Sequence, residues 1–378
     1  MGNNTHVQMN PFNLGILNED GSCSKEYLDL IPDEDLVRIL KTMILNRVFE
    51  TRMMTLQRQG RLGFMLMSTG EEAITIGSSY CLKQDDPLFL SYRELGSLLW
   101  RGVPPEDIMN QLLGNVRDHN KGRQMPVHYC YREYHIPSVS APVGTQLPHA
   151  CGYAYASKYL KTGQVSLAFL GEGAASANDF HSAMNFASVF QAPVVYVIRN
   201  NGYAISTPES VQTAAESLAI RAEGYGMPGI QIDGTDILLV VKTIREAVHR
   251  AREGRGPTLI EALTYRIGAH SSSDDPSRYR PQKEVDQWKA FDDIERTIRH
   301  STWRGIWSHS MTKETQAKAE EQVTRCIKEC ETYPPPPLDS LFEDVYEKIP
   351  NHLHEQKKMY LDYLAKKGEK SAVFSSEE

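Results

Sequence analysis

The sequence has few cysteines, no long hydrophobic run and no excess of positive charge, and each shortage argues against a class of protein. Its six cysteines are scattered over 378 residues, and no second cysteine or histidine pair accompanies Cys326 and Cys330, so we expect neither a disulfide framework nor a zinc site. The longest apolar stretches, such as 193–198, are far shorter than the ~20 residues of a membrane span. Forty-one Lys and Arg against 48 Asp and Glu give a net charge of −7, which argues against a nucleic-acid-binding surface.

No Lys or Arg occurs in the first eighteen positions, where a transit peptide would be rich in arginine. A secretory signal is not recognisable either, because the positively charged start and the apolar core are both missing. Hydrophobic residues make up 40% and charged residues 24% of the chain, which is typical of a soluble globular protein. We therefore expect either a cytoplasmic protein or the mature form of an imported one.

The middle third of the chain alternates between two kinds of pattern. Apolar runs rich in β-branched residues occupy 165–170, 194–198, 230–232 and 258–263, and helical patterns separate them, the clearest over 237–252. This alternation predicts an α/β fold with a parallel sheet that helices flank on both faces. Such sheets bind ligands at the carboxyl ends of their strands, so we expect the functional loops to follow the apolar runs.

Helical spacing also occurs outside the predicted sheet. One helix is predicted from Asp33 to Gly60, and others over 288–298 and 312–331. From these patterns we expect one α/β domain with appendages, divided as follows: an extended N-terminal arm over 1–30, the domain over 31–333, and a Pro-rich spacer with a C-terminal tail over 334–378.

The strongest local signal is a pair of short polar motifs, each placed directly after an apolar run. Gly171-Glu172-Gly173 follows the first run and Asn200-Asn201 follows the next, with the 26 residues 174–199 between them. In a parallel sheet this spacing places Glu172 and Asn201 at neighbouring strand ends. A carboxylate and an amide oxygen suit Mg²⁺, which completes its shell with phosphate and water. Glycines permit close backbone approach, and a helix expected from Ala174 offers N–H groups to an anion, so we predict a magnesium–diphosphate cradle.

Two other interpretations of these motifs compete with the cradle. Residues 171–176 partly match the dinucleotide fingerprint G-x-G-x-x-G, but Ser176 replaces the third glycine and Asn200-Asn201 stands where an acid should follow the next strand. An ordinary glycine turn would be the default if the asparagine pair were absent. The presence of both halves favours the metal site.

Together these motifs are similar to the thiamine diphosphate signature, in which magnesium bridges the protein and the cofactor diphosphate. The segments 122–129, 171–176, 199–207 and 265–271 go further and resemble the alpha subunit of branched-chain 2-oxoacid dehydrogenase. The pyruvate dehydrogenase alpha subunit is the alternative, but it usually shows Gly-Asp-Gly and Gly-Gly-Ser-Met-His. The corresponding places here read Gly-Glu-Gly and Arg-Gln-Met-Pro-Val-His.

The resemblance implies the diphosphate-side thiamine diphosphate-binding fold and a role for each matching residue. Magnesium would be held by Glu172, Asn201 and the backbone carbonyl of Tyr203. Cofactor contacts would come from Tyr92, Arg93, Ala141, Val143, Gly171, Glu172, Gly173, Ala174, Arg199, Asn201, Tyr203 and His270. A potassium ion would be held by Ser140, Pro142, Thr145 and Gln146. Many relatives have serine at position 141, so Ala141 lacks a hydroxyl that would face the cofactor.

The resemblance also implies the reaction and its partners. The thiazolium carbanion attacks a 2-oxo group and accepts electrons during decarboxylation, and a glutamate on a second, pyrimidine-binding domain activates the cofactor. Because only one α/β domain is found here, we expect a beta subunit in an α2β2 heterotetramer and a lipoyl-bearing transacylase. His270, with a pKa near neutral, would assist reductive acylation of the lipoyl group. Without the resemblance, a hydrogen-bonded core histidine would be its default interpretation.

The loop 270–281 matches the phosphorylation site of the resembled family at Ser271, whereas Pro281 stands where the family has a second serine. A phosphate at Ser271 would repel the diphosphate and disorder the lipoyl entry route, which implies a regulatory kinase and phosphatase. This loop favours the mitochondrial matrix over a bacterial cytoplasm.

Pyruvate or acetoin dehydrogenase remains an alternative activity. A non-catalytic docking scaffold is the alternative from another class, and it predicts a damaged cradle.

Overall fold

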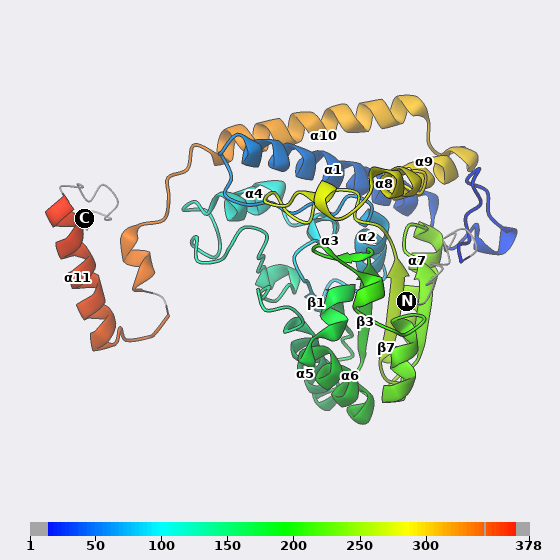
Figure 1. Ribbon diagram of the computed structural model, residues 1–378, viewed down its shortest axis with the longest axis horizontal. Helices are drawn as coiled ribbons and strands as arrows, with labels where there is room; N and C mark the ends of the chain where they lie inside the picture. The colour runs from blue at the N-terminus through cyan, green and yellow to red at the C-terminus, as the bar shows by residue number, and fades with distance from the viewer. Residues whose placement is uncertain (1–13, 344, 368–378) are drawn as a thin grey trace.

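The computed structural model describes residues 14–343 and 345–367. Its main sheet has five strands in the order β1-β2-β3-β7-β6, and every pairing in it is parallel. The strands are β1 Leu88–Phe89, β2 Ser166–Gly171, β3 Val194–Asn200, β6 Gly229–Asp233 and β7 Thr258–Leu263. A separate antiparallel pair joins β4 Tyr203–Ala204 to β5 Thr207–Pro208. The predicted parallel sheet and α/β class are confirmed (Figure 1).

Both faces of the sheet are buried at β2, β3 and β7, which explains why these strands are largely continuous apolar runs and not alternating ones. Successive side chains point to opposite faces. Leu167 and Phe169 therefore lie in one core cluster with α7 (Ile237–Arg252) and α1 (Asp33–Arg58). Ala168 and Leu170 lie in the other, with α5 (Gln146–Leu160) and α6 (Asn178–Phe190). The sheet is thus held between two helical layers (Figure 1).

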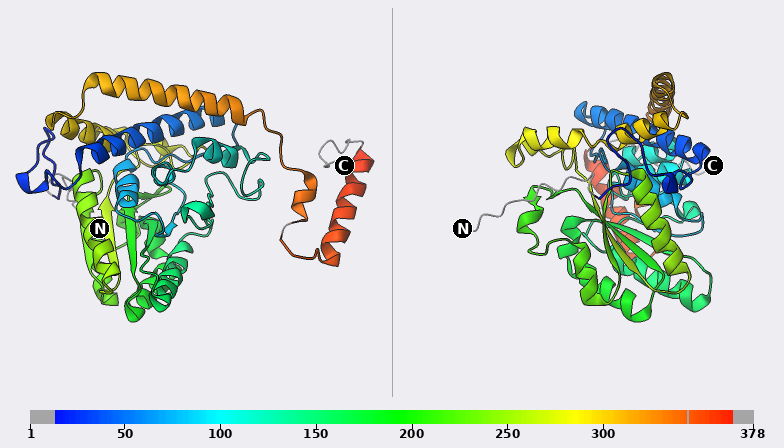
Figure 2. Two further views of the ribbon diagram at one scale, coloured as in Figure 1. Left: turned by 180° about the vertical axis from the view of Figure 1, so that it is seen from behind. Right: turned by 90° about the vertical axis from the view of Figure 1, so that its right-hand side faces the viewer.

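The remaining helices surround this framework. They are α2 Glu72–Tyr80, α3 Leu95–Arg101, α4 Pro105–Leu113, α8 Gln282–Lys289, α9 Asp293–Trp303, α10 His309–Cys330 and α11 Asn351–Lys367. In Figures 1 and 2, α1 and α10 run side by side along one edge of the body. No helix in the described ranges is long and apolar enough to cross a membrane.

Several predicted boundaries hold and two are wrong. The α7 range is as predicted, and α1 starts at Asp33, where three acidic residues favour the positive end of the helix. The single helix predicted over 288–298 is instead two, because Asp292 caps a new helix by accepting from the backbone N–H groups of Ile294 and Glu295. The helix expected from Ala174 starts only at Asn178, after a 3₁₀ turn over 172–176.

The two appendages differ in how they contact the body. In the predicted arm, residues 1–13 lie outside the described residues. Leu17 is buried, and its backbone N–H and that of Ile16 donate to the carboxylate of Asp236 at the start of α7. At the other end α11 stands apart from the body (Figure 2). Lys357 joins it to Asp339 by an ion pair of 2.5 Å. Residue 344 and residues 368–378 of the predicted tail lie outside the described residues.

The apolar side of α6 should support the sheet energetically. Phe180→Ala should lower the free energy of unfolding by about 3–5 kcal/mol, because the buried ring leaves a cavity against the strands. Urea titration followed by far-UV circular dichroism measures this loss. Phe186→Ala, on the same helix but 53% exposed, should change the free energy of unfolding by less than about 0.5 kcal/mol. Equal losses in the two variants would contradict this packing.

Candidate active site

The two polar motifs meet at the carboxyl edge of the sheet. In the β2–β3 ladder Gly171 pairs with Arg199, so Glu172 and Asn201 follow neighbouring parallel strands at the same edge, as predicted. Both side chains are buried, at 3% and 5% exposure. This edge is the place where open parallel sheets bind their ligands.

Glu172 is a buried carboxylate with an unused oxygen. Among the described residues, its Oε1 atom has no hydrogen-bond partner. Burial raises the pKa of Glu172, and the nearby charge of Glu71 raises it further, whereas backbone N–H groups and Arg266 oppose the shift. An unpaired buried carboxylate oxygen is costly unless a cation or donor meets it. The Glu172 side chain therefore fits the role of a metal ligand.

The other two predicted metal ligands already have contacts within the chain. The Asn201 amide nitrogen donates to Glu71 at 2.9 Å, and its oxygen lies 3.4 Å from the backbone nitrogen of Tyr203. The Tyr203 carbonyl accepts from Arg266 at 2.8 Å, which leaves one of its two lone pairs. No cluster of three or more His, Cys, Asp or Glu side chains suited to a metal occurs in the described part of the chain. A cation here would depend on one carboxylate, amide and carbonyl oxygens, and oxygens from its ligand, which suits Mg²⁺.

The two glycines of the motif differ in their surroundings. A Cβ atom at Gly173 would lie 2.6 Å from the Cβ of Ala204 on β4, so the close approach there is to the chain itself. A Cβ at Gly171 would meet nothing within 4 Å. Ala174 is buried in the 3₁₀ turn, so the N–H groups expected from a helix start belong to this turn and not to α6.

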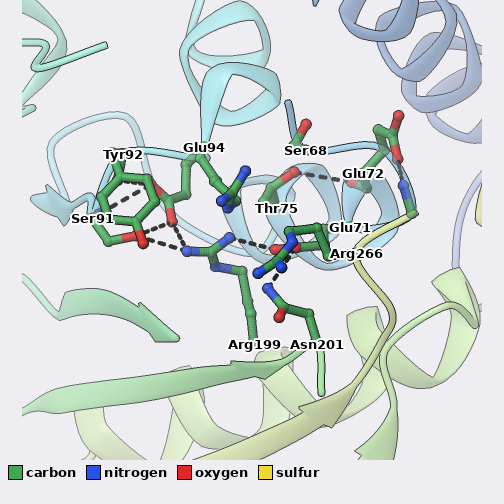
Figure 3. Close-up of polar contacts among 12 residues, drawn as sticks. Ser68, Glu71, Glu72, Thr75, Ser91, Tyr92, Glu94, Arg199, Asn201 and Arg266 are labelled. Atoms are coloured by element: carbon green, nitrogen blue, oxygen red, sulfur yellow. Dashed lines mark hydrogen bonds and ion pairs between the residues drawn. The ribbon is translucent and has the colours of Figure 1, made fainter. Parts of the chain in front are cut away.

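Arg199 reaches from β3 into a group of buried acceptors (Figure 3). Its guanidinium forms ion pairs with Glu71 and Glu94 and donates to the Ser91 hydroxyl at 2.7 Å. Burial opposes the charge, but the two carboxylates outweigh it and raise the pKa of Arg199. Its Nε atom has no partner among the described residues. A rigid, permanently charged donor in a dry site is well suited to phosphate oxygens.

Tyr92, Arg93 and His270 also come together. Arg93 donates to the backbone oxygens of Met67 at 2.7 Å and of His270 at 2.6 Å, and its Nη2 lies 3.0 Å from His270 Nδ1. The guanidinium also lies over the Tyr92 ring, at 5.4 Å from its centroid. Arg93 is 3% exposed and Glu94 is fully buried, so neither side chain lies at the protein surface.

The contact with Arg93 fixes the tautomer of His270. A guanidinium can only donate, so Nδ1 must be the acceptor and the neutral ring must carry its proton on Nε2. The expectation of a near-neutral pKa is wrong for this chain. Burial, and then the charges of Arg93 and Arg266, lower the pKa of His270 to about 4. His270 is therefore a neutral Nε2–H donor at physiological pH.

The loop after His270 is an ordered network. Asp274 accepts from the His270 backbone at 2.7 Å and from the Tyr279 hydroxyl at 2.5 Å, and Arg266 donates to the same hydroxyl at 3.0 Å. Because Arg266 also holds the Tyr203 carbonyl, this network joins the loop to the predicted metal site. Ser271 is only 7% exposed, so its hydroxyl is not accessible while the loop keeps this conformation.

The predicted potassium loop precedes α5. Ala141 and Val143 are exposed, with Val143 at 57%. The Pro142 carbonyl accepts from the Thr145 hydroxyl at 3.0 Å, and the Gln146 amide nitrogen donates to the Phe169 backbone at 2.8 Å. These contacts are those of an ordinary turn and helix start. Potassium binding by Ser140 and its neighbours remains a prediction.

Four residues of this site were given no predicted role, although Arg266 lies within the segment 265–271 quoted above: Glu71, Ser91, Glu94 and Arg266. They contact the predicted cofactor residues through segments far apart in the sequence; Glu71 and Arg199, for example, are 128 positions apart. In the sequence, Glu71 has the usual appearance of an acid at a helix start. The contact between Glu71 and Arg199 arises only in the folded chain.

The family model described as "Dehydrogenase E1 component" matches residues 40–339. The chain belongs to the dehydrogenase E1 component family. Within this family it is 40% identical over 352 residues to "2-oxoisovalerate dehydrogenase subunit alpha, mitochondrial" of Dictyostelium discoideum, which covers 92% of this chain and 80% of the relative. The Homo sapiens protein of that name is 40% identical over 340 residues, covering 90% and 76%. The alpha 1 subunit of Arabidopsis thaliana is 39% identical over 361 residues, covering 93% and 75%. These findings confirm the resemblance to branched-chain alpha subunits.

The lowered pKa of His270 gives a test of the site. Because the folded pKa of about 4 lies below the ordinary 6.5, the unfolded chain binds the proton more readily, and His270 should cost stability as pH falls through this range. Nitrogen NMR of ¹⁵N-histidine-labelled chain, assigned with His270→Gln, should show a neutral Nε2–H ring that titrates below pH 5. A midpoint near 6.5 or an Nδ1–H ring would contradict the contact with Arg93.

Proposed function

We propose that this chain is the alpha subunit of a thiamine diphosphate-dependent 2-oxoacid dehydrogenase that decarboxylates branched-chain 2-oxo acids and acylates the lipoyl group of a transacylase. The observation that carries this proposal is the unpaired Oε1 of Glu172 beside Asn201 at the β2–β3 edge, in a chain 40% identical to the human alpha subunit. Bound thiamine diphosphate would supply a carbon nucleophile, the thiazolium carbanion, and its thiazolium ring would serve as the electron sink for decarboxylation.

Two groups of residues would hold the diphosphate, one through Mg²⁺ and one directly. Glu172, Asn201 and the Tyr203 carbonyl would bind Mg²⁺, and Arg93 and Arg199 would face the phosphate oxygens. The formal charges of the six buried residues assigned to the site cancel, since three carboxylates accompany three arginines: Glu71, Glu94, Glu172, Arg93, Arg199 and Arg266. A diphosphate alone would upset this balance, whereas a diphosphate with Mg²⁺ largely preserves it. This balance supports joint binding of metal and cofactor.

His270 holds a proton on Nε2, at the end of the ring that does not contact Arg93. From there the neutral ring can donate a hydrogen bond to a phosphate oxygen, whereas transfer of a proton to a lipoyl sulfur during acyl transfer would require the imidazolium form. Burial, and then the charges of Arg93 and Arg266, lower the pKa of His270 and keep its ring neutral in the chain alone, and an incoming diphosphate would offset the charge of the two arginines. His270 is thus the acid–base residue of the proposed reaction.

An exposed apolar patch supports the proposed beta subunit. On α5 and α6, Tyr155 and Phe190 have ring centroids 4.8 Å apart, and Phe186 stacks on Phe190 at 5.8 Å. All three are exposed, and such patches mark protein contacts. The beta subunit would supply the pyrimidine-binding domain and complete an α2β2 heterotetramer. We place the assembly in the mitochondrial matrix, since the relatives are named mitochondrial. We also propose that the loop 140–146 binds a potassium ion.

Cofactor binding tests the cradle directly. In the full chain co-expressed with its beta subunit, Glu172→Ala or Asn201→Ala should weaken binding of thiamine diphosphate with Mg²⁺ about 100-fold, because each removes a metal ligand. Isothermal titration measures the affinity. Asn178→Ala, the same change at an exposed position on α6, should leave it unaltered. Unchanged affinity in the Glu172 and Asn201 variants would refute the cradle and favour the scaffold alternative.

Substrate preference separates the proposed enzyme from the pyruvate and acetoin enzymes. A pocket for a branched side chain gains about 1–3 kcal/mol from each additional carbon group, so kcat/KM for 3-methyl-2-oxobutanoate should exceed that for pyruvate at least about tenfold. Decarboxylation by the same complex measures both values. A preference for pyruvate would assign the chain to the alternative.

We also propose that Ser271 is phosphorylated by a regulatory kinase and reset by a phosphatase. The hydroxyl is buried and accepts from the Ser273 backbone at 3.3 Å, so modification requires the loop to open, and a phosphate would prevent it from closing beside the diphosphate. Ser271→Asp should therefore reduce lipoyl acylation about tenfold or more, while Ser271→Ala should retain it. Equal acylation by both variants would count against control at this position.

A further inference from the structure

Glu71 lies between the predicted diphosphate arginine and the predicted metal ligand. One carboxylate oxygen accepts from Arg199, and the other accepts from the Asn201 amide nitrogen at 2.9 Å (Figure 3). Glu71 is fully buried. Both donors come from the end of β3, so a single carboxylate holds two neighbouring side chains of the site.

The backbone before Glu71 is fixed by close contacts. Gly70 has φ +94°, and a Cβ there would lie 2.5 Å from the Tyr265 carbonyl, so only glycine allows this approach. The Gly70 backbone donates to Glu72 at 2.7 Å, and the Ile267 backbone donates to Thr69 at 3.3 Å. These contacts fasten the segment to the chain just after β7 and hold Glu71 at the strand tips.

The chemistry of the contact determines how the Asn201 amide faces. A carboxylate only accepts hydrogen bonds, so the amide nitrogen must point to Glu71 and the amide oxygen must point away from it. That oxygen lies on the side of the Tyr203 backbone nitrogen, at 3.4 Å. An amide without such a partner can turn over and present its N–H groups to a cation, which would repel them.

We infer that Glu71 is a positioning residue that orients the Asn201 oxygen for Mg²⁺ and, through Arg199, the guanidinium for the diphosphate. This inference rests on the proposed function, because it concerns the same metal and cofactor. The metal ligand Asn201 and the diphosphate-facing Arg199 would then both depend on the Glu71 carboxylate. Neither ligand motif contains this residue, and its role follows from the contacts alone.

Glu94 offers a matched control. It is also fully buried and also pairs with Arg199, but its other contacts are to the Ser91 backbone at 3.0 Å, the Ser91 hydroxyl at 2.7 Å and the Tyr92 backbone at 2.9 Å. None of the hydrogen bonds found for Glu94 in the described residues involves Asn201. Removing its charge perturbs Arg199 and leaves the Asn201 amide held.

The test compares Glu71→Gln with Glu94→Gln in the full chain co-expressed with its beta subunit. The amide oxygen of the Glu71 variant should accept from Arg199, and its N–H groups should then face Asn201 and turn the Asn201 amide over. Mg²⁺ affinity, titrated calorimetrically with thiamine diphosphate saturating, should fall about 10–100-fold. Glu94→Gln should weaken thiamine diphosphate binding but keep Mg²⁺ affinity within about threefold of the unaltered chain.

Activity and a second variant keep the inference open to refutation. The Glu71→Gln loss of activity should be larger at low than at saturating Mg²⁺, whereas a damaged fold lowers activity equally at both. If Glu71→Gln does not fold, Glu71→Asp carries the test, because its shorter side chain cannot span both donors and should show the same Mg²⁺ loss. Mg²⁺ affinity within about threefold of the unaltered chain in the folded variant, or an equal loss in Glu94→Gln, would overturn the inference.

Two further arms separate this inference from the proposed function. The unaltered complex must bind Mg²⁺ together with thiamine diphosphate, and Glu172→Ala must lose that binding; failure of either overturns the proposed function and the inference with it. If both arms behave as proposed while Glu71→Gln binds Mg²⁺ normally, only the positioning role fails.

Discussion

The structure depends on a buried carboxylate that the chain leaves half satisfied. Glu172 follows β2 directly, and its Oε1 has no partner in the described residues. Burying such an oxygen has a free-energy cost that a structural role alone would not explain. A divalent cation bound there, as proposed, would remove that cost, and the neighbouring Asn201 and Arg199 would accompany the cation and its anionic ligand.

The parallel sheet places these groups next to one another at one edge. Continuous apolar runs bury β2 and β3 on both faces, and their pairing of Gly171 with Arg199 brings the two motifs to one edge. Side chains that arrive from elsewhere then orient them: Glu71 and Glu94 hold Arg199, and Arg266 joins the Tyr203 carbonyl to the loop at Asp274 and Tyr279. The dry, charge-balanced setting makes each of these contacts stronger than it would be in water.

The strands, α7 and the predicted metal-site motifs could be predicted from the sequence because their signals are local. Strand runs, the α7 pattern and the spacing between Gly171-Glu172-Gly173 and Asn201 depend on neighbours along the chain. The rest is tertiary: Glu71 meets Arg199 only through the fold, the close approach at Gly173 is to Ala204, and the low pKa of His270 arises from burial beside Arg93 and Arg266. Where helices start also depended on such detail, since the cap at Asp292 split one predicted helix into two.

The most direct test of the central claim is the position of a bound cation. Crystals of the full assembly with thiamine diphosphate, grown with Mn²⁺ in place of Mg²⁺, would locate the ion by its anomalous scattering. One peak should lie within about 2.0–2.3 Å of both Glu172 Oε1 and Asn201 Oδ1, as expected for metal–oxygen bonds. A peak away from these two oxygens, or a bound cofactor with no cation between them, would contradict it.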